Sequence, residues 1–353
     1  MKEQIEKVIA ACDFADRRVN LFDVRVEGFD GTRALLAGRV LEPSDLDALR
    51  RALQQNLPDL RADFSAVRVL RREPRETRVV ATNLTDLHRE PSFLSELMTQ
   101  VLNGVELEIL EEAGNWCFVR QGDGYLGWAY KPYLRPAPPV RATHLVVSPV
   151  AIVGAEATIN VLAPATRLLA GTPVRVVEWQ QPDRWRARVE VAGDMIATGW
   201  VRAGDLEALE GLSAAPEEAR NRIVSYARAF RGTYYLWGGN SAFGIDCSGL
   251  AQLVHRLAGH DIPRDADMQF AAGRPVEPPF RAGDLLFFGG DPTTVAAGAI
   301  HKRKITHVGL ATGDGWHMIH SSRLHNGVYE DDVQQREHLR TTFAGARSFF
   351  PSI

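Results

Sequence analysis

Residues 246–259 read DCSGLAQLVHRLAG and are the most informative stretch of this chain of 353 residues. Apolar residues recur there at the i, i+3, i+4, i+7 spacing of one helix face, which predicts a helix over 248–258: Leu250, Leu253, Val254 and Leu257. Asp246 is a candidate N-cap, and Gly259 is typical of the residue that follows a helix. Cys247 is therefore expected in the first turn. There the free N–H groups and the helix dipole should lower the pKa of the thiol and make it a nucleophile.

Two histidines on neighbouring strand-like segments are the candidate partners of this thiol. Residues 305–311 and 316–321 read as strands joined by a turn at Gly313 and Asp314. A tight turn there would place His307 opposite His320 on one face of the sheet. His307 would then take the thiol proton, and His320 would fix the tautomer of His307. A metal site is the alternative for paired histidines, but the chain has neither H-E-x-x-H nor C-x-x-C, so we expect no metal.

Composition excludes several classes of protein. The chain has 41 basic and 44 acidic residues, a net charge of −3, 45% hydrophobic residues and 24% charged residues, which is ordinary globular composition and argues against a nucleic-acid partner. The three cysteines, Cys12, Cys117 and Cys247, are too few and too scattered for a disulfide framework. Residues 1–20 lack the apolar run of a signal peptide, and no stretch is long enough to span a membrane. We therefore expect a cytoplasmic location with no membrane partner.

The pattern along the chain divides it into four expected domains. Residues 1–75 read as a small unit of order αββαβ. Residues 76–137 and 138–210 read as two small β-barrels, because Gly127-Trp128 followed by Leu134 recurs as Gly199-Trp200 followed by Leu206. Trp116 and Trp185 form a second pair of matching positions in this repeat. Residues 211–353 read as an α+β domain and contain eight of the ten histidines, so the chemistry is expected there.

This last domain resembles the NlpC-type cysteine peptidases of bacterial cell-wall metabolism. The motifs that carry the resemblance occur in the family's order: Tyr235-Leu236-Trp237-Gly238-Gly239, Asp246-Cys247-Ser248-Gly249-Leu250, Pro263-Arg264-Asp265, residues 282–288, Ile305-Thr306-His307-Val308-Gly309 and Met318-Ile319-His320. The barrels resemble the bacterial SH3-like domains that accompany such enzymes. The fold class that follows is multidomain α+β: an N-terminal α/β unit, two SH3-like β-barrels and a C-terminal papain-like α+β catalytic domain.

The resemblance also implies roles for individual residues. Cys247, His307 and His320 match the nucleophile, the base and the third member of the catalytic triad. Two further groups match positions that line the active site or contact substrate: Tyr235, Asp246 and Ser248, and Arg264 and Asp265. Ala266 stands where the family often has a hydroxyl residue, and the segment 289–304 is longer than usual, either as a lid or as a surface insertion. No cofactor is implied.

The whole architecture is similar to one branch of the family, the γ-D-glutamyl-L-diamino-acid endopeptidases (dipeptidyl-peptidase VI) that recycle murein peptides. In that branch the first barrel holds the free amino terminus of L-Ala-γ-D-Glu-diamino acid with an acidic residue and a tyrosine. Glu90 and Tyr125 are the matching positions here. The expected substrate is a murein tripeptide or tetrapeptide, with diaminopimelate or lysine in third position. The alternatives are a secreted hydrolase or amidase of intact peptidoglycan, and a non-catalytic module that binds wall peptides. The oligomeric state and the role of residues 1–75 stay open.

Overall fold

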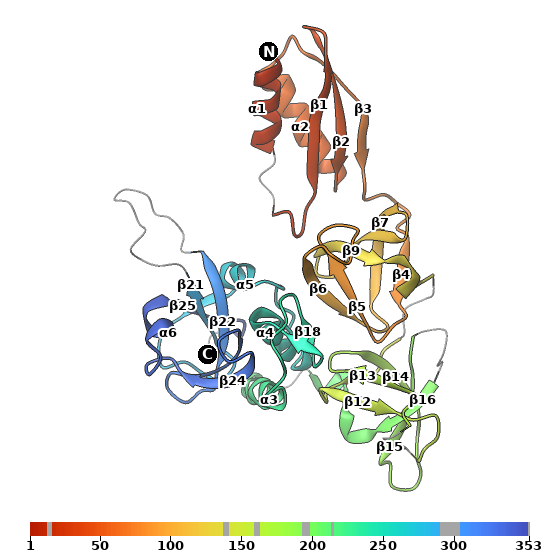
Figure 1. The fold of residues 1–353 in the computed structure, drawn as a ribbon, viewed down its shortest axis with the longest axis vertical. Helices are drawn as coiled ribbons and strands as arrows, with labels where there is room; N and C mark the ends of the chain where they lie inside the picture. The colour runs from red at the N-terminus through yellow and green to blue at the C-terminus, as the bar shows by residue number, and fades with distance from the viewer. Residues whose placement is uncertain are drawn as a thin grey trace.

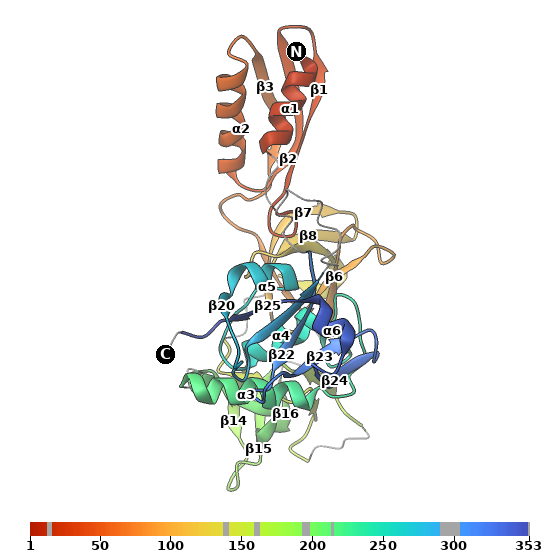
Figure 2. The same cartoon turned by 90° about the vertical axis from the view of Figure 1, so that its left-hand side faces the viewer.

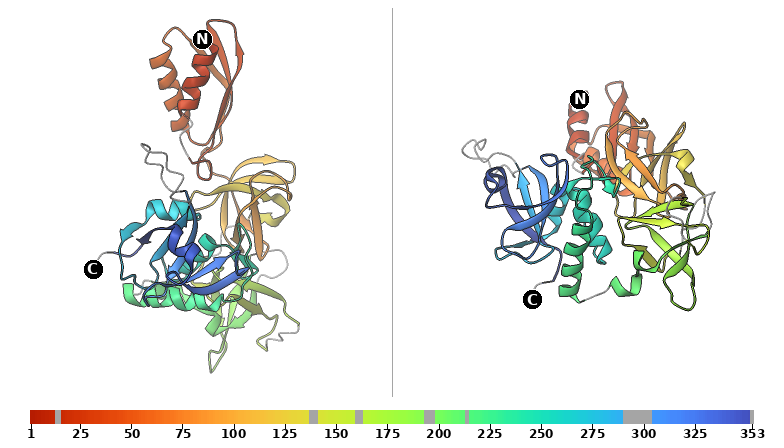
Figure 3. Two further views of the ribbon diagram at one scale, coloured as in Figure 1. Left: turned by 60° about the vertical axis from the view of Figure 1, so that its left-hand side comes forward. Right: turned by 60° about the horizontal axis from the view of Figure 1, so that its bottom comes forward.

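The computed structural model describes residues 1–12, 16–136, 141–158, 163–192, 198–212, 215–289 and 304–351. The chain forms an N-terminal unit, two barrels and a C-terminal unit, and the N-terminal unit projects from one end of the molecule (Figures 1 and 3). Within the described residues, no helix combines the length and the apolar character needed to cross a membrane. The segment 290–303, which contains nearly all of the expected lid or insertion, lies outside the described residues.

The N-terminal unit has the expected order αββαβ. Its elements are α1 (Lys2–Cys12), β1 (Phe22–Phe29), β2 (Arg33–Val40), α2 (Pro43–Asn56) and β3 (Arg61–Val69). Strand β2 pairs antiparallel with β1 and parallel with β3. Both helices cover one face of this sheet (Figure 2) and bury Ile5, Ile9, Leu49 and Leu53 against its apolar side chains. The 3.6-residue spacing of these positions explains why one face of each helix is buried.

The first barrel follows directly in the chain. Its strands are β4 (Thr77–Val80), β5 (Leu84–His88), β6 (Leu97–Leu102), β7 (Glu106–Ala113), β8 (Trp116–Arg120), β9 (Leu126–Tyr130) and β10 (Leu134–Arg135). They form one sheet in the order β10-β4-β7-β8-β9-β5-β6, closed around Leu87, Leu107, Val119 and Ala129.

The second barrel repeats part of this plan. Its strands are β11 (His144–Val146), β12 (Val150–Val153), β13 (Thr166–Leu169), β14 (Pro173–Trp179), β15 (Arg186–Glu190), β16 (Thr198–Arg202) and β17 (Leu206–Ala208). In both barrels the Gly-Trp strand leads through one 3₁₀ turn, Lys131–Tyr133 or Ala203–Asp205, into a short last strand, which confirms the repeat. Trp185 is not the counterpart of Trp116, because strand pairing puts Arg186, opposite Arg202, at the position that Trp116 has opposite Tyr130.

The C-terminal unit packs helices against a six-stranded sheet. Its helices are α3 (Pro216–Ala229), α4 (Cys247–Leu257), α5 (Ala266–Ala272) and α6 (Glu337–Thr342). Its sheet has the order β20-β25-β21-β22-β23-β24, with β20 (Arg274–Val276), β21 (Leu285–Gly289), β22 (Ile305–Ala311), β23 (His317–Ser322), β24 (Gly327–Asp332) and β25 (Phe343–Ser348). A short hairpin, β18 (Asn240–Ser241) with β19 (Gly244–Ile245), precedes α4. The expected multidomain α+β fold class is confirmed, whereas the boundary at residues 137–138 lies outside the described residues and stays a prediction.

The first barrel contacts both the N-terminal and the C-terminal unit. Leu41 and Leu70 of the N-terminal unit pack on Trp116, Phe118 and Trp128. On its other side, Gln100 accepts hydrogen bonds from Asn240 N at 3.1 Å and Ser241 Oγ at 3.3 Å. Gly238 has φ +74°, and a Cβ there would lie 2.4 Å from the Leu97 carbonyl oxygen, so only glycine allows this close approach. The barrel is thus fixed against the segment that leads into α4.

Candidate active site

Cys247 is the first residue of α4, as the sequence predicts. The Asp246 side chain caps this helix by accepting a hydrogen bond from Gly249 N at 2.6 Å, and it also accepts one from Gly238 N at 2.8 Å. Gly249 has no room for a side chain, since a Cβ would lie 2.3 Å from the Gly239 carbonyl oxygen. These contacts hold the first turn of α4 against the preceding loop, so the thiol has a fixed position at one wall of a cavity.

Arg264 holds the same turn in place, and all of its N–H groups are hydrogen-bonded within the protein. Its guanidinium donates to both carboxylate oxygens of Asp246, at 3.0 and 2.7 Å, and to Ser248 Oγ at 3.0 Å. Its two remaining N–H groups donate to Thr99 Oγ1 and to the Gly239 carbonyl oxygen. All five donors therefore have protein partners. Arg264 is 2% exposed and is absent from the cavity lining, so its position does not support the expected contact with substrate; its hydrogen bonds hold the Asp246–Ser248 turn.

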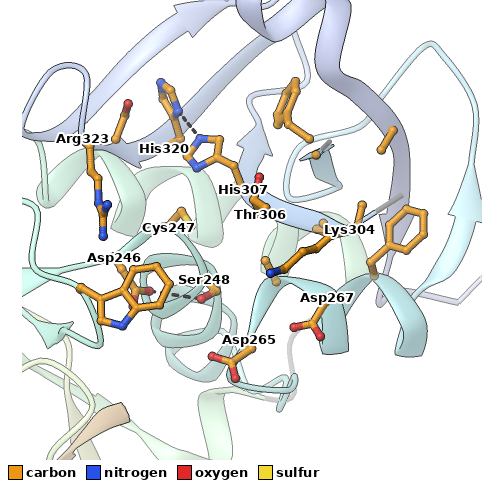
Figure 4. A pocket seen from close by; sticks show the side chains of 18 of the residues that line it. Asp246, Cys247, Ser248, Asp265, Asp267, Lys304, Thr306, His307, His320 and Arg323 are labelled. Atoms are coloured by element: carbon orange, nitrogen blue, oxygen red, sulfur yellow. Dashed lines mark hydrogen bonds between the residues drawn. The ribbon is translucent and has the colours of Figure 1, made fainter. Parts of the chain in front are cut away.

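The two candidate histidines are hydrogen-bonded to each other. His307 Nε2, on β22, lies 2.7 Å from His320 Nδ1, on β23. Figure 4 shows both rings at the same end of the cavity, with the Cys247 thiol directed toward His307. The pair therefore has the arrangement that the sequence predicts for a base and the residue that orients it.

The strand register behind this pair differs from the prediction by two residues. Ala311 pairs with Met318 rather than with Trp316, because the turn holds more residues than expected and closes with a hydrogen bond from Thr312 N to the His317 carbonyl oxygen at 3.0 Å. A shift of two residues leaves every side chain on its original face. His307 and His320 thus meet as diagonal rather than directly opposite neighbours, and diagonal pairs remain within reach of ring side chains.

Asp331 on β24 completes the chain of contacts, and no motif in the sequence predicts it. Its Oδ2 lies 3.1 Å from His320 Nε2 and 3.1 Å from His325 Nε2, and Arg336 Nε donates to its Oδ1 at 2.8 Å. Hydrogen bonding with His320 and the nearby Arg336 hold the pKa of this carboxyl below its usual range, although burial opposes them. The contact follows from the pairing of β23 with β24. His320 lies opposite Tyr329, so Asp331, two residues further along β24, is the diagonal neighbour of His320.

These contacts determine which ring nitrogen of His307 has no proton. An ionised carboxylate only accepts hydrogen bonds, so His320 Nε2 carries a proton toward Asp331. In neutral His320 the other nitrogen, Nδ1, then accepts from His307 Nε2–H. The remaining nitrogen of His307, Nδ1, has no proton in the neutral ring and is free to accept one from the thiol.

Burial keeps the free site neutral, which corrects the expectation of a thiol with a lowered pKa. Burial, together with the charge of Asp246, raises the pKa of Cys247 to about 12, and hydrogen bonds from the backbone of Val308 and Ser248 oppose this only in part. Burial, with His320 adding to it, lowers the pKa of His307 to about 3. Desolvation penalises both charged forms and outweighs the helix N-terminus. These two shifts both favour the uncharged forms, a thiol and a neutral imidazole, in the free site.

The cavity beside this pair has a volume of about 1960 Å³ and an acidic end. At that end Tyr125 Oη donates to Asp265 Oδ2 at 2.9 Å, and Arg18 of the N-terminal unit contacts Asp265 and Asp267. Figure 4 shows the carboxylates of Asp265 and Asp267 at the end away from His320 and Arg323. Burial raises the pKa of Tyr125, so its hydroxyl stays protonated and donates.

The other predicted residues divide into two groups. Tyr235 and Ser248 line the cavity as expected, and burial raises the pKa of Tyr235 to about 12. Glu90 lies in an exposed turn and does not line the cavity, so its position does not support the predicted contact with an amino terminus. The carboxylate that this barrel does supply is Glu96, which accepts from Trp237 Nε1 at 3.0 Å. Glu96 lies six residues after Glu90, in the segment between β5 and β6, and no motif in the surrounding sequence predicts its place in the cavity.

Comparisons with known proteins agree with this geometry. Residues 232–347 match the model of the NlpC/P60 family, and residues 87–129 match that of the bacterial dipeptidyl-peptidase SH3 domain. The γ-D-glutamyl-L-lysine dipeptidyl-peptidase of Bacillus subtilis is 30% identical over 241 residues, which cover 66% of this chain and 74% of that protein. The protein of the same name from Bacillus cereus is 28% identical over 271 residues, 73% of this chain and 76% of that one.

A solved structure supports the fold. An NlpC/P60 family protein from Bacillus cereus superimposes with a TM-score of 0.64 at 22% identity, covering 78% of this chain and all of that chain. The chain therefore belongs to the NlpC/P60 family, and it is a cysteine peptidase.

Proposed function

We propose that this protein hydrolyses the γ-D-glutamyl–L-diamino acid bond of murein peptides that have a free N-terminal L-Ala, releasing L-Ala-γ-D-Glu. The observation that carries the proposal is one cavity with two chemically different ends: a cysteine–histidine pair at one, and Tyr125 with Asp265 at the other. A partly buried carboxylate beside a hydroxyl suits an ammonium group. The relatives named for γ-D-glutamyl-L-lysine peptides support this choice of substrate.

The first half of the reaction uses the contacts of His307. The Cys247 thiol transfers its proton to His307 Nδ1 as its sulfur attacks the γ-carbonyl carbon, so proton transfer accompanies attack rather than preceding it. This timing follows from the neutral resting pair. The imidazolium formed on His307 is stabilised by His320, which is itself hydrogen-bonded to the negative Asp331. His307 then gives the proton to the leaving amine, and a thioester to Cys247 remains.

The second half regenerates the thiol. Water loses a proton to His307 Nδ1 as its oxygen attacks the thioester carbonyl, and the proton returns to the sulfur as the carbon–sulfur bond breaks. Backbone N–H groups at the start of α4 are the proposed donors to the oxyanion. Throughout, Asp265 and Tyr125 hold the amino terminus and thereby place the γ-amide bond at Cys247.

The proposed setting is the recycling of wall peptides in the cytoplasm. A site that needs a free amino terminus rejects peptides still joined to glycan, because that amine is then acylated and uncharged. Such a preference suits released peptides rather than intact wall. It also suits a compartment that keeps the three cysteines reduced.

Mass spectrometry of peptide digests tests this proposal. Purified protein is incubated with L-Ala-γ-D-Glu-L-Lys and with the meso-diaminopimelate peptide, and we expect L-Ala-γ-D-Glu from at least one of them. Cys247→Ala protein is the control and should leave both peptides intact. Release of fragments from intact sacculi, with both free peptides unchanged, would instead support the alternative of a wall hydrolase.

A further inference from the structure

Arg18 is the one residue of the N-terminal unit that lines the cavity within the part of the chain that the structure describes. It lies outside both segments that match family models, 87–129 and 232–347. Its side chain is only 25% exposed, although it stands on a loop between α1 and β1. Arg18 therefore links a unit of unassigned role to the cavity that contains Cys247.

The backbone of Arg18 is fixed beside the proposed amine site. Its carbonyl oxygen accepts a hydrogen bond from Leu126 N at 2.7 Å, next to Tyr125 in the chain. The N-terminal unit as a whole is held on the first barrel by apolar contacts of Leu41 and Leu70 and by the ion pair of Arg39 with Glu111 at 2.6 Å. The guanidinium is thus delivered by a docked unit rather than by a free tail.

The guanidinium is shared among three carboxylates. Nη1 donates to Asp265 Oδ2 at 2.8 Å and Asp267 Oδ1 at 2.7 Å, and Nη2 donates to Asp267 Oδ2 at 2.7 Å. Its Nε donates to Asp16 Oδ1 at 2.9 Å. Lys304 also lines the cavity, so three carboxylates face two cations there, and the remaining negative charge favours an incoming ammonium.

The orientation of Asp265 shows what Arg18 does. Asp265 is the N-cap residue of α5, where an aspartate ordinarily bonds to the N–H groups of its own helix. Its side chain makes no such bond and is turned toward Arg18 and Tyr125, which both donate to Oδ2. Among the described residues no hydrogen-bond donor reaches Oδ1, and a carboxylate oxygen left open in this way can receive an ammonium group.

We propose that Arg18 makes the N-terminal unit part of the substrate site, as a positioning residue that turns Asp265 toward the free amino terminus of the peptide. This inference rests on the proposed function for the identity of the peptide. The groups that face Asp265 are Arg18 and Asp16 from the N-terminal unit, Tyr125 from the first barrel, and Arg264 and Asp267 from the C-terminal unit. Burial raises the pKa of Asp265, and Arg264, Arg18 and Tyr125 oppose it, so removal of Arg18 should raise it further.

Steady-state kinetics of Arg18→Ala and Arg18→Lys on the free tripeptide test the positioning role. Arg39→Ala is the matched control, because it removes an ion pair between the same two units but does not touch the cavity. For Arg18→Ala we expect KM to rise about tenfold with kcat within about twofold of the parent, the size of one hydrogen bond to a charged group. The fall of kcat/KM on the acid side should begin at higher pH, and Arg18→Lys should recover part of the loss.

Carbon-13 NMR of the Asp265 carboxyl provides a readout that needs no turnover. Its pKa is expected to rise in Arg18→Ala, because a neighbouring positive charge is lost, and to stay unchanged in Arg39→Ala. If the parent protein cleaves neither tripeptide, the proposed function fails while this titration still decides the role of Arg18. The inference would be overturned by an unchanged pKa of Asp265 in Arg18→Ala, or by equal effects of Arg18→Ala and Arg39→Ala. A lower KM in Arg18→Ala would also overturn it, because Arg18 would then be competing with the ammonium of the substrate.

Discussion

The two ends of the cavity are built in different ways. The reacting end takes Cys247, His307, His320 and Asp331 from α4 and three adjacent strands of one unit. The acidic end joins Arg18, Tyr125 and Asp265 from three units. In the proposed function, one unit supplies the groups that cleave the bond, and contacts between three units supply the groups that select the peptide. Changes at the reacting end should therefore reduce kcat, and changes at the acidic end should raise KM.

Cys247→Ala should have the largest effect. Loss of the nucleophile is expected to lower kcat at least about 10³-fold, as removal of a nucleophile does in other covalent peptidases. Binding of L-Ala-γ-D-Glu, measured by calorimetry, should stay within about twofold, since alanine leaves the acidic end intact. Cys12→Ala is the matched control and should keep full activity, because Cys12 lies in α1. A Cys247→Ala protein that still cleaved peptide would place the nucleophile elsewhere.

Asp331→Asn should be the next most severe change. The amide can donate a hydrogen bond as well as accept one, so it no longer fixes the proton on His320 Nε2 or leaves His307 Nδ1 free. We expect kcat to fall about 10- to 100-fold with KM unchanged. The fall should be smaller than for loss of a residue that contacts His307 directly, because Asp331 acts on His307 through His320. Asp332→Asn, on the same strand with its nearest His317 nitrogen at 4.0 Å, serves as control. A rise in KM alone would argue against the proton-positioning role.

Tyr125→Phe should affect the other end of the cavity. It removes the hydroxyl that donates to Asp265 Oδ2, and we expect KM for the free tripeptide to rise about tenfold with little change in kcat. Tyr130→Phe, in the same barrel and outside the cavity lining, should behave as the parent protein. If kcat of Tyr125→Phe fell by as much as KM rose, the two ends of the cavity would not act separately.

The smallest expected effect concerns alkylation of the Cys247 thiol by iodoacetamide. Near pH 7 we expect Cys247 to react no faster than an ordinary thiol. Because burial raises the pKa of Cys247, the thiolate fraction near pH 7 is low, and the rate of alkylation should climb about tenfold per pH unit between pH 6 and 9 without a plateau. The Cys247→Ala variant corrects for Cys12 and Cys117. A rate that is high and flat across this range would mean a thiolate–imidazolium pair in the free protein.

The same division explains how much could be predicted from the sequence. The helical spacing after Cys247 and the N-cap Asp246 are local patterns, so α4 was predicted to within one residue at each end. The pairing of His307 with His320 survived a wrong register because the shift was even. Asp331 was missed because its contact depends on a strand pairing that no motif marks.

The resemblance named Tyr125 and Asp265 of the acidic end, but the contact of Asp265 with Arg18 could not be predicted because it joins two separate units. Arg18 and Asp265 are 247 positions apart, and nothing in the spacing of either residue indicates their contact. The motif predicts a substrate contact for Arg264, whereas in the structure it is buried and makes five hydrogen bonds to four residues, two of them to Asp246. The pKa of Cys247 was misjudged for a related reason, since a sequence reveals a helix N-terminus but not the depth of burial.

The most direct test of the account is the ratio of kcat/KM for L-Ala-γ-D-Glu-L-Lys to that for its N-acetyl form, measured in the parent protein and in Tyr125→Phe. Acetylation removes the charge that Asp265 is proposed to bind while leaving the scissile bond unchanged. We expect the parent to prefer the free amine by about 100-fold and Tyr125→Phe to narrow that preference by about tenfold. Equal rates on the two peptides in the parent protein would contradict the assignment of the acidic end to the amino terminus.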